Sequence, residues 1–351
     1  MPESVLGYIA SCLGALRMIF RREYSLRFMV MAAVLSLAAM SGARAQSPSL
    51  QDLISGVVGV KTFINPDART TENLGGEREG SGIVIDDSGL VLTIGYLMVE
   101  AHAAELTLDD GRTLPASVVG YDHQTGFGLL RAMTPLKVRP MRLGTAAELK
   151  KGDAVLVVSS GGPTMVLPAH VAALREFTGS WEYLLERAIF TSPPHPEWSG
   201  AALINREGRL IGVGSLIVSD AAGDGGDGGG NMFVPIDILS PILADLTSAG
   251  HVTGPRRPWL GVGAEPVNGQ LKVQRVTQGG PAQLAGLRKG DVIVGVAGEE
   301  TTTLSDFYRR VWARGTAGAV IPLDVMQENQ KRRLEVRSAD RLDHLRLKST
   351  Y

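Results

Sequence analysis

Cysteine is nearly absent from this chain of 351 residues, in which Cys12 is the single example. One thiol cannot form an internal disulfide, so no disulfide framework holds the fold. Cys12 also lies in an N-terminal stretch that we expect to be removed, which would leave the mature protein without a thiol nucleophile. Cysteine-based catalysis and disulfide-stapled folds are therefore excluded for the mature chain.

Aromatic residues are scarce, and neither sign of charge is in excess. Aromatic side chains make up 5% of the chain, and 35 basic and 36 acidic residues give a net charge of -1. This near-equal number of basic and acidic residues provides no general attraction for nucleic acid or for an anionic membrane. Glycine is plentiful instead, with 43 residues, and this suits many short strands joined by tight turns.

A long hydrophobic run is missing as well. Basic residues at 21, 22 and 27 precede the apolar residues 28–40, and small residues ending in Ala45 follow. The apolar run is too short to span a bilayer comfortably, and the order of these parts is typical of a secretory signal. We therefore predict an export signal region over 1–45, cleavage near Ala45, and a periplasmic or secreted mature protein. A retained membrane anchor is the alternative, because residues 5–20 are also apolar.

From Gly56 onward the chain consists of short β-runs separated by turn residues. The runs are 57–64, 82–85, 90–93, 104–108, 116–120 and 128–131, and then 154–159, 169–174, 187–191, 202–205, 210–217 and 232–235. Regular short strands of this kind indicate a barrel or a sandwich. We predict two β units, at about 50–142 and 143–250, and a closing helix over 240–249, where apolar residues fall at helical spacing.

Several motifs follow one another in a fixed order along these units. They are Gly80–Ile85, Gly89–Thr93, Val118–Asp122, Lys151–Asp153, Ser199–Asn205, Gly208–Val213 and Phe233–Pro235. In order and spacing they resemble the HtrA/Deg (DegP-like) family of serine proteases, over roughly residues 50–339. The resemblance implies a mainly β fold, with a trypsin/chymotrypsin-like double β-barrel over 46–250 and a C-terminal PDZ domain of the α+β class.

The catalytic positions of the family can be located here by their neighbours. The family's histidine follows the threonine of the first-barrel motif, and Tyr96 occupies that place. The family's aspartate follows a Val-Gly-Tyr-Asp motif, and Gly126 stands at its position. The family's serine lies in a Gly-Asn-Ser-Gly-Gly motif, which here contains Ser199. One of the three triad members is therefore kept, as a remnant nucleophile.

This loss removes the chemistry that activates a serine. The hydroxyl needs a neighbouring base, and a third group must hold that base in one tautomer. A tyrosine, with an unperturbed pKa near ~10, is protonated at neutral pH and is a poor acceptor. The oxyanion-hole region, Glu197, Trp198 and Ser199, places a carboxylate and an indole where the family has smaller residues. We therefore expect a reshaped, inactive site.

Another histidine is the alternative source of a base. His195 lies four residues before Ser199, and His123 lies close to the lost aspartate position. Histidines in surface loops without a role are the more common case. None of the six shows the paired spacing of metal ligands, so we expect no metal and no cofactor.

The chain after a Pro- and Arg-bearing linker at 251–258 resembles a PDZ domain over 259–339. The resemblance implies a carboxylate-binding loop and first groove strand at Trp259, Leu260, Gly261 and Val262, and a groove helix over 303–314 that contributes Phe307 and Val311. A peptide would add as a strand, with its carboxylate on N–H groups around 259–261. A PDZ fold that merely packs on the barrel is the alternative. The charged tail 340–351 is expected to be mobile.

Three functions remain compatible with the sequence. The first is an inactive protease homologue that binds peptides or unfolded and misfolded proteins, including their C-termini, through its PDZ domain. The second is an active serine endopeptidase that uses Ser199 with a non-standard base. The third is a regulatory subunit of an active HtrA-type protease. Neither a homo-oligomer nor association with such a protease is decided by the sequence, and no nucleic acid partner is expected.

Overall fold

The computed structural model describes residues 48–225 and 228–347. The predicted export signal and Cys12 therefore lie outside the described residues. Among the residues it describes, no helix is long and apolar enough to cross a membrane.

A first closed barrel follows the short helix α2 (Leu50–Ser55). Its strands run in the order β1-β2-β3-β6-β5-β4, and all pairs are antiparallel. They are β1 (Val57–Ile64), β2 (Glu77–Val84), β3 (Leu90–Ile94), β4 (Ala101–Thr107), β5 (Thr113–Tyr121) and β6 (Phe127–Ala132), with α3 (Thr71–Leu74) and the 3-10 helix η1 (Gly95–Leu97) between strands. The turn from β2 to β3 closes because the Asp86 carboxylate accepts from the N–H of Leu90.

A second closed barrel has the order β10-β11-β12-β9-β8-β7. Its strands are β7 (Ala154–Val158), β8 (Val166–Gly179), β9 (Tyr183–Ser192), β10 (Ala202–Ile204), β11 (Leu210–Val218) and β12 (Gly230–Pro235), with η2 (Pro163–Met165) before β8. Strands β8 and β9 pair as far as Gly179 and Tyr183, and so form a long hairpin with a tip at 180–182. Side chains of both barrels, including Phe127 and Phe190, share one buried cluster. The predicted double barrel is confirmed.

The segment after β12 differs slightly from its prediction. The 3-10 helix η3 (Ile236–Ile238) comes first, and the helix α4 (Leu243–Ala249) is shorter than the predicted 240–249. It ends at Gly250, which takes the left-handed conformation that favours glycine at such a position.

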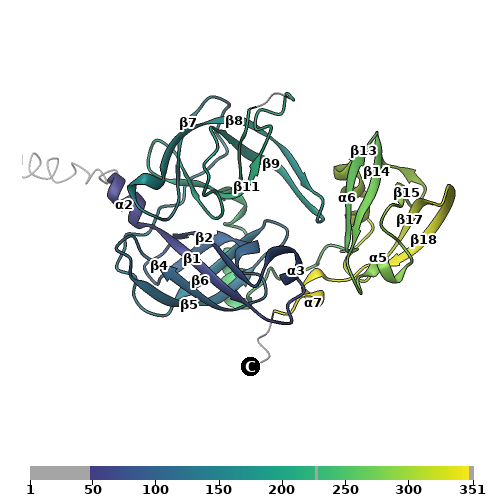
Figure 1. The fold of residues 1–351 in the computed structure, drawn as a ribbon, viewed down its shortest axis with the longest axis horizontal. Coiled ribbons are helices and arrows are strands. Elements are labelled where there is room, and N and C mark those ends of the chain that lie inside the picture. The colour runs from purple at the N-terminus through teal and green to yellow at the C-terminus, as the bar shows by residue number, and fades with distance from the viewer. Residues whose placement is uncertain (1–47, 226–227, 348–351) are drawn as a thin grey trace, which may run out of the picture. The chain divides into compact units, whose positions relative to one another are not determined.

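A separate antiparallel sheet in the order β13-β14-β15-β17-β18 forms the C-terminal unit. It contains β13 (Val262–Val267), β14 (Gln270–Val276), β15 (Val292–Val296), β17 (Val320–Gln327) and β18 (Gln330–Arg337), and β16 (Glu299–Glu300) pairs with β15. The helices are α5 (Pro281–Leu284), α6 (Leu304–Trp312) and α7 (Arg341–His344). Figure 1 colours the first barrel purple to blue, the second teal, and this unit green to yellow.

The tail after this sheet, up to residue 347, forms the short helix α7 and is hydrogen-bonded to the first barrel, whereas the sequence suggested a mobile segment. Asp340 caps α7 by accepting from the N–H of Leu342. Beyond the helix, the N–H of Arg346 donates to the buried carboxylate of Glu100 at 2.6 Å, and the Asn65 amide donates to the Arg346 carbonyl. Backbone groups and charged side chains of this tail therefore both make contacts, the latter including the ion pair of Asp340 with Arg256.

Candidate functional site

Ser199 lies in the loop between β9 and β10, and this loop is held tightly against β2. The Ser199 carbonyl accepts from the N–H of Ser81 at 2.8 Å. The next residue, Gly200, has φ +73, and a Cβ there would lie 1.9 Å from the Ser81 carbonyl oxygen. The glycine after the serine is thus required both by backbone conformation and by space.

Tyr96, on η1, contacts the serine directly. Its hydroxyl oxygen lies 2.8 Å from the Oγ of Ser199 and 3.0 Å from the carbonyl oxygen of Ser215. A phenol has one proton and a carbonyl can only accept, so both contacts are satisfied when Tyr96 donates to Ser215 and Ser199 donates to Tyr96. Burial raises the pKa of Tyr96 to about 12, which keeps its hydroxyl protonated at neutral pH.

Gly126 lies in the turn before β6 and provides no group that could orient a base. It has φ +83, and its carbonyl accepts from the N–H of Gly95 at 2.6 Å. A Cβ at this position would meet the Tyr183 hydroxyl at 3.1 Å. The nearby carboxylate of Asp122 is buried and caps the same turn by accepting from the N–H of Thr125.

The oxyanion-hole region is engaged in local hydrogen bonds. The N–H of Glu197, two residues before the serine, donates to Nδ1 of His195 at 3.0 Å. The Glu197 carbonyl accepts from the Ser159 hydroxyl, and the Glu197 side chain is exposed. The Trp198 carbonyl packs against Gly214, where a Cβ would lie 2.0 Å from it. The N–H that would stabilise an oxyanion is therefore bonded to an imidazole.

His195 is buried and both of its ring nitrogens have partners. Since Nδ1 accepts from Glu197, the ring proton lies on Nε2, which is 3.2 Å from the Met165 carbonyl oxygen. The backbone N–H of His195 also donates to the Asn231 side chain at 2.6 Å. Burial lowers the pKa of His195, so the ring is neutral. No hydrogen bond joins His195 to Ser199 in the described part of the chain.

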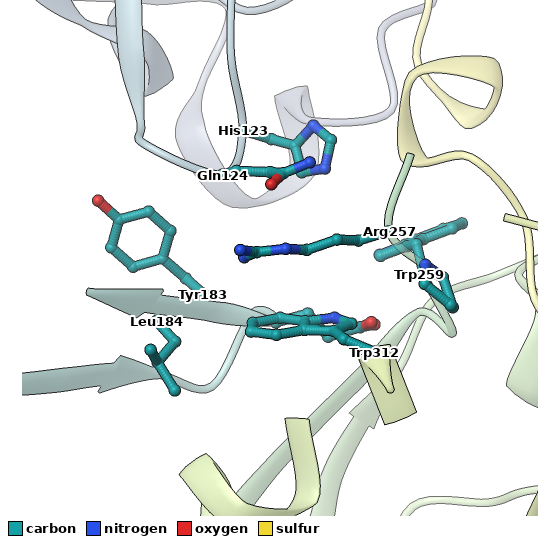
Figure 2. Close-up of a pocket in the computed structure, with 9 residues that line it drawn as sticks. His123, Gln124, Tyr183, Leu184, Arg257, Trp259 and Trp312 are labelled. Atoms are coloured by element: carbon teal, nitrogen blue, oxygen red, sulfur yellow. The ribbon is translucent and has the colours of Figure 1, made fainter. Parts of the chain in front are cut away.

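His123 lies apart from Ser199, in a small pocket with Arg257 and Trp312 among its lining residues. Figure 2 shows the Arg257 side chain between the Trp312 ring and the His123–Gln124 pair, and its guanidinium carbon is 4.4 Å from the Trp312 ring centre. Burial, followed by the charges of nearby arginines, lowers the pKa of His123 to about 3. Within residues 48–225 and 228–347, no group of three or more His, Cys, Asp or Glu side chains could hold a metal ion.

The predicted carboxylate-binding loop holds a carboxylate from the chain itself. The N–H groups of Leu260, Gly261 and Val262 all donate to the side chain of Glu182, at the tip of the β8–β9 hairpin. The N–H of Trp259 instead donates to the Ala339 carbonyl at 3.0 Å. The N–H groups that bind this carboxylate are therefore those of residues 260–262, one residue beyond the 259–261 predicted for a peptide carboxylate.

The predicted groove residues of α6 are deeply buried. Phe307 and Val311 are each 1% exposed and belong to the core of the C-terminal unit. Between them lies Tyr308, which the sequence places on the same apolar helical stripe without a predicted role, and its hydroxyl contacts the hairpin. Neither Glu182 nor Tyr308 matches a motif, because each acts through contacts between segments about eighty to one hundred and thirty residues apart.

Comparisons with known proteins agree with this architecture. Residues 80–213 match a family described as "Trypsin-like peptidase domain", and residues 258–337 match one described as "PDZ domain". An HtrA-type protease structure, AlgW with decapeptide, matches with a TM-score of 0.51 and 22% identity over 83% of this chain and 98% of that chain. This likeness supports the predicted fold, a trypsin-like double barrel followed by a PDZ domain.

The similar proteins with curated names are named as putative or probable serine proteases. "Putative serine protease HhoA" of Synechocystis sp. (strain ATCC 27184 / PCC 6803 / Kazusa) is 30% identical over 287 residues, which cover 74% of this chain and 70% of the relative. "Probable periplasmic serine endoprotease DegP-like" of Pseudomonas putida (strain W619) is 29% identical over 73% of this chain and 55% of the relative. "Probable periplasmic serine protease do/HhoA-like" of Haemophilus influenzae is 28% identical, over 75% of this chain and 60% of the relative. The chain thus spans between about half and about two thirds of these relatives.

Proposed function

Because the chain belongs to the HtrA/Deg family of serine proteases, in which a trypsin-like domain precedes a PDZ domain, we infer that its function depends on the activity of each of these two parts. We propose that it is an exported family member that has lost peptidase activity and binds peptides or unfolded proteins through its PDZ domain. The contact between Tyr96 and Ser199 at 2.8 Å carries this proposal.

Beside the serine, where the family has a histidine that accepts a proton, this chain has the protonated hydroxyl of Tyr96. A serine attacks a carbonyl only when a neighbour takes its proton, and a phenol with a pKa of about 12 does not do so near neutral pH. Tyr96 also fills the space beside Oγ, so another base has no access from that side. Gly126 contributes no carboxylate that would orient a replacement.

The state of the oxyanion-hole region supports the same proposal. A developing oxyanion needs N–H donors aimed at it before the reaction starts. Here the N–H of Glu197 is bonded to His195, and releasing it would leave a buried imidazole nitrogen without a partner. Inactivity therefore depends on two independent features of the site.

The PDZ domain supports the binding part of the proposal. Three consecutive N–H groups, at 260–262, converge on one carboxylate, and Gly261 has the positive φ of +77 that such a turn needs. Consecutive backbone N–H groups of this kind bind anions, including the C-terminal carboxylates of peptides. The proposed ligand is therefore a peptide with a free C-terminus, such as one exposed by an unfolded or cleaved protein.

Two observations support a periplasmic location. The relatives from Pseudomonas putida and Haemophilus influenzae are named periplasmic, and the predicted signal over 1–45 agrees with that location. We therefore place the mature protein in the periplasm, with cleavage near Ala45.

The second candidate is an active serine endopeptidase, favoured by the retained Ser199 hydroxyl and by the names of the relatives. Incubating the exported form, from residue 46 onward, with unfolded casein and a fluorophosphonate probe separates the two. A Ser199→Ala variant is the control, and an active DegP-type protease validates the assay. We expect neither cleavage nor labelling. Cleavage and labelling that both disappear in Ser199→Ala would establish the peptidase instead.

A further inference from the structure

The tip of the β8–β9 hairpin lies in the groove of the PDZ domain. Residues 180–182 connect the two strands. The backbone of Glu182, the last of them, has φ +60, which is uncommon for a residue other than glycine. Glu182 is 8% exposed although a glutamate at a hairpin tip would normally face solvent. Contacts with the PDZ domain stabilise this buried position of Glu182.

The first support is the carboxylate-binding loop. Oε1 of Glu182 accepts from the N–H groups of Gly261 at 2.6 Å and Val262 at 3.0 Å, and Oε2 accepts from the N–H of Leu260 at 3.0 Å. A buried carboxylate needs donors for its lone pairs, and the three N–H groups offset part of the burial that raises the pKa of Glu182. This is the geometry in which a PDZ loop receives a peptide's terminal carboxylate.

The second support is Tyr308 on α6. Its hydroxyl donates to the Gly179 carbonyl at 2.9 Å and accepts from the N–H of Glu182 at 3.0 Å. Both hydrogen-bonding roles of the phenol are therefore used on backbone groups of the hairpin. The loop before β13 and the helix α6 thus bind the hairpin tip from two sides.

Two further contacts surround the tip. Arg341 on α7 donates to the Trp181 carbonyl at 2.9 Å. Arg309 on α6 forms ion pairs with Glu176 and Glu186 on the two strands, all of them partly or fully exposed. Exposed pairs contribute little, so the buried carboxylate and the Tyr308 hydroxyl account for the specificity of the contact.

We propose that the β8–β9 hairpin is an internal ligand of the PDZ groove, with the Glu182 carboxylate in the position of a peptide's C-terminal carboxylate, so that a peptide must displace the hairpin to bind. The proposal rests on the PDZ domain's proposed function and adds its regulation. The displacing ligand is a peptide chain with a free C-terminal carboxylate, because the same N–H groups can donate to either carboxylate.

Competition of this kind has a calculable effect on affinity. When the free groove is a minor state, the apparent Kd equals the intrinsic Kd divided by the fraction of free groove. A groove that is free in roughly 1–10% of molecules weakens peptide binding about 10- to 100-fold. Removing the Glu182 charge should recover that factor, because a neutral amide is a poorer match for three N–H donors.

The test measures binding of fluorescein-labelled decapeptides that end in Ala, Val, Leu or Phe, by fluorescence polarisation, to the whole exported chain. Glu182→Gln keeps the size of the side chain and removes its charge. Glu207→Gln removes the same charge from an exposed residue between β10 and β11, away from the hairpin tip. We expect Glu182→Gln to bind free-carboxylate peptides about 10- to 100-fold more tightly than the unaltered chain. Glu207→Gln should match the unaltered chain, and amidated peptides should bind none of the three proteins.

Equal affinity of the unaltered chain and Glu182→Gln would overturn the internal-ligand proposal and leave the peptide-binding function intact. Absence of binding to every variant would overturn that function as well, and so the two failures are distinguishable. Tyr308→Phe provides a second route, should Glu182→Gln fail to fold. It removes the hydroxyl that holds the hairpin backbone and should also raise peptide affinity, whereas unchanged affinity would count against the proposal.

Discussion

The backbone N–H of Glu197 donates to Nδ1 of His195 over 3.0 Å. This one hydrogen bond affects two parts of a serine protease site. It engages the N–H of Glu197, which lies at the predicted oxyanion-hole position. It also engages the Nδ1 lone pair that His195 would need to act as a base for Ser199. A rebuilt dyad would therefore require the loop before Ser199 to change its conformation.

Restoring the histidine alone should not restore activity. We expect Tyr96→His to remain unlabelled by a fluorophosphonate and inactive on casein, because the Glu197 N–H stays bonded to His195 and position 126 still lacks a carboxylate. The measurement is the rate of Ser199 labelling, compared between the unaltered chain, Tyr96→His and Ser199→Ala. Recovery of activity in Tyr96→His would show that the missing base was the single defect.

Alkaline pH should not activate Ser199 either. With a pKa raised to about 12, Tyr96 is ionised to about 1% at pH 10. We expect the labelling rate above background to stay at zero from pH 6 to pH 10 in the unaltered chain. Tyr96→Phe is the matched control, because it lacks the ionisable hydroxyl. Labelling that rises with pH in the unaltered chain and not in Tyr96→Phe would contradict this account.

Local sequence signals were sufficient for most of the fold. Alternating strands and turn residues predicted both barrels, and the ordered motifs placed Tyr96 beside Ser199, where the structure has it. The glycine after the serine was part of a motif, and its reason is steric. These features are short-range or repeat a known pattern, so one sequence is enough to find them.

Contacts between distant segments were not predictable in the same way. The hairpin continues to Gly179 and Tyr183, but residues 175–186 do not alternate regularly, so the predicted strands ended at 174 and began again at 187. Nothing local marks Glu182 as a buried carboxylate, because its three donors lie about eighty residues further along the chain. The helical stripe of α6 likewise does not distinguish core positions such as Phe307 from positions that contact the groove.

Acid should destabilise the protein through His123. The pKa of this ring is lowered to about 3, whereas in an unfolded chain it is about 6.5, so the unfolded state binds more protons between these values. The resulting contribution to stability is present above about pH 6.5 and is lost as the pH falls, by about 1–2 kcal/mol at pH 5.

The check is urea unfolding at pH 7 and pH 5. We expect the free energy of unfolding to fall less between the two pH values in His123→Gln than in the unaltered chain, by about 1–2 kcal/mol. His195 and His344, whose pKa values burial also lowers, remain in both proteins and so cancel in this comparison. Equal pH dependence in the two proteins would contradict the burial of a neutral His123.

The loop carrying Ser199 should be sensitive to a single methyl group. Gly200→Ala adds a Cβ that would lie 1.9 Å from the Ser81 carbonyl oxygen, in addition to an unfavourable φ of +73. Gly152→Ala is a matched control, since Gly152 has φ +90 and no atom within 4 Å of the added Cβ. We expect losses of about 1–2 kcal/mol for Gly152→Ala and at least about 3 kcal/mol for Gly200→Ala, measured by urea unfolding. Similar losses would mean that the clash is relieved by movement of the loop.

The β8–β9 hairpin has a consequence for both ends of strand β9. Its tip is bound by the PDZ groove, and its far end, Ser192, is seven residues from Ser199. Binding equilibria that share one structural element are thermodynamically linked, and the linkage acts equally in both directions. Under the internal-ligand proposal, a peptide that expels the tip from the groove would change the affinity of the barrel for a partner bound to this strand, and that partner would change the affinity for the peptide by the same factor. With the proposed loss of catalysis, the chain would in this way act as a sensor that responds to two ligands.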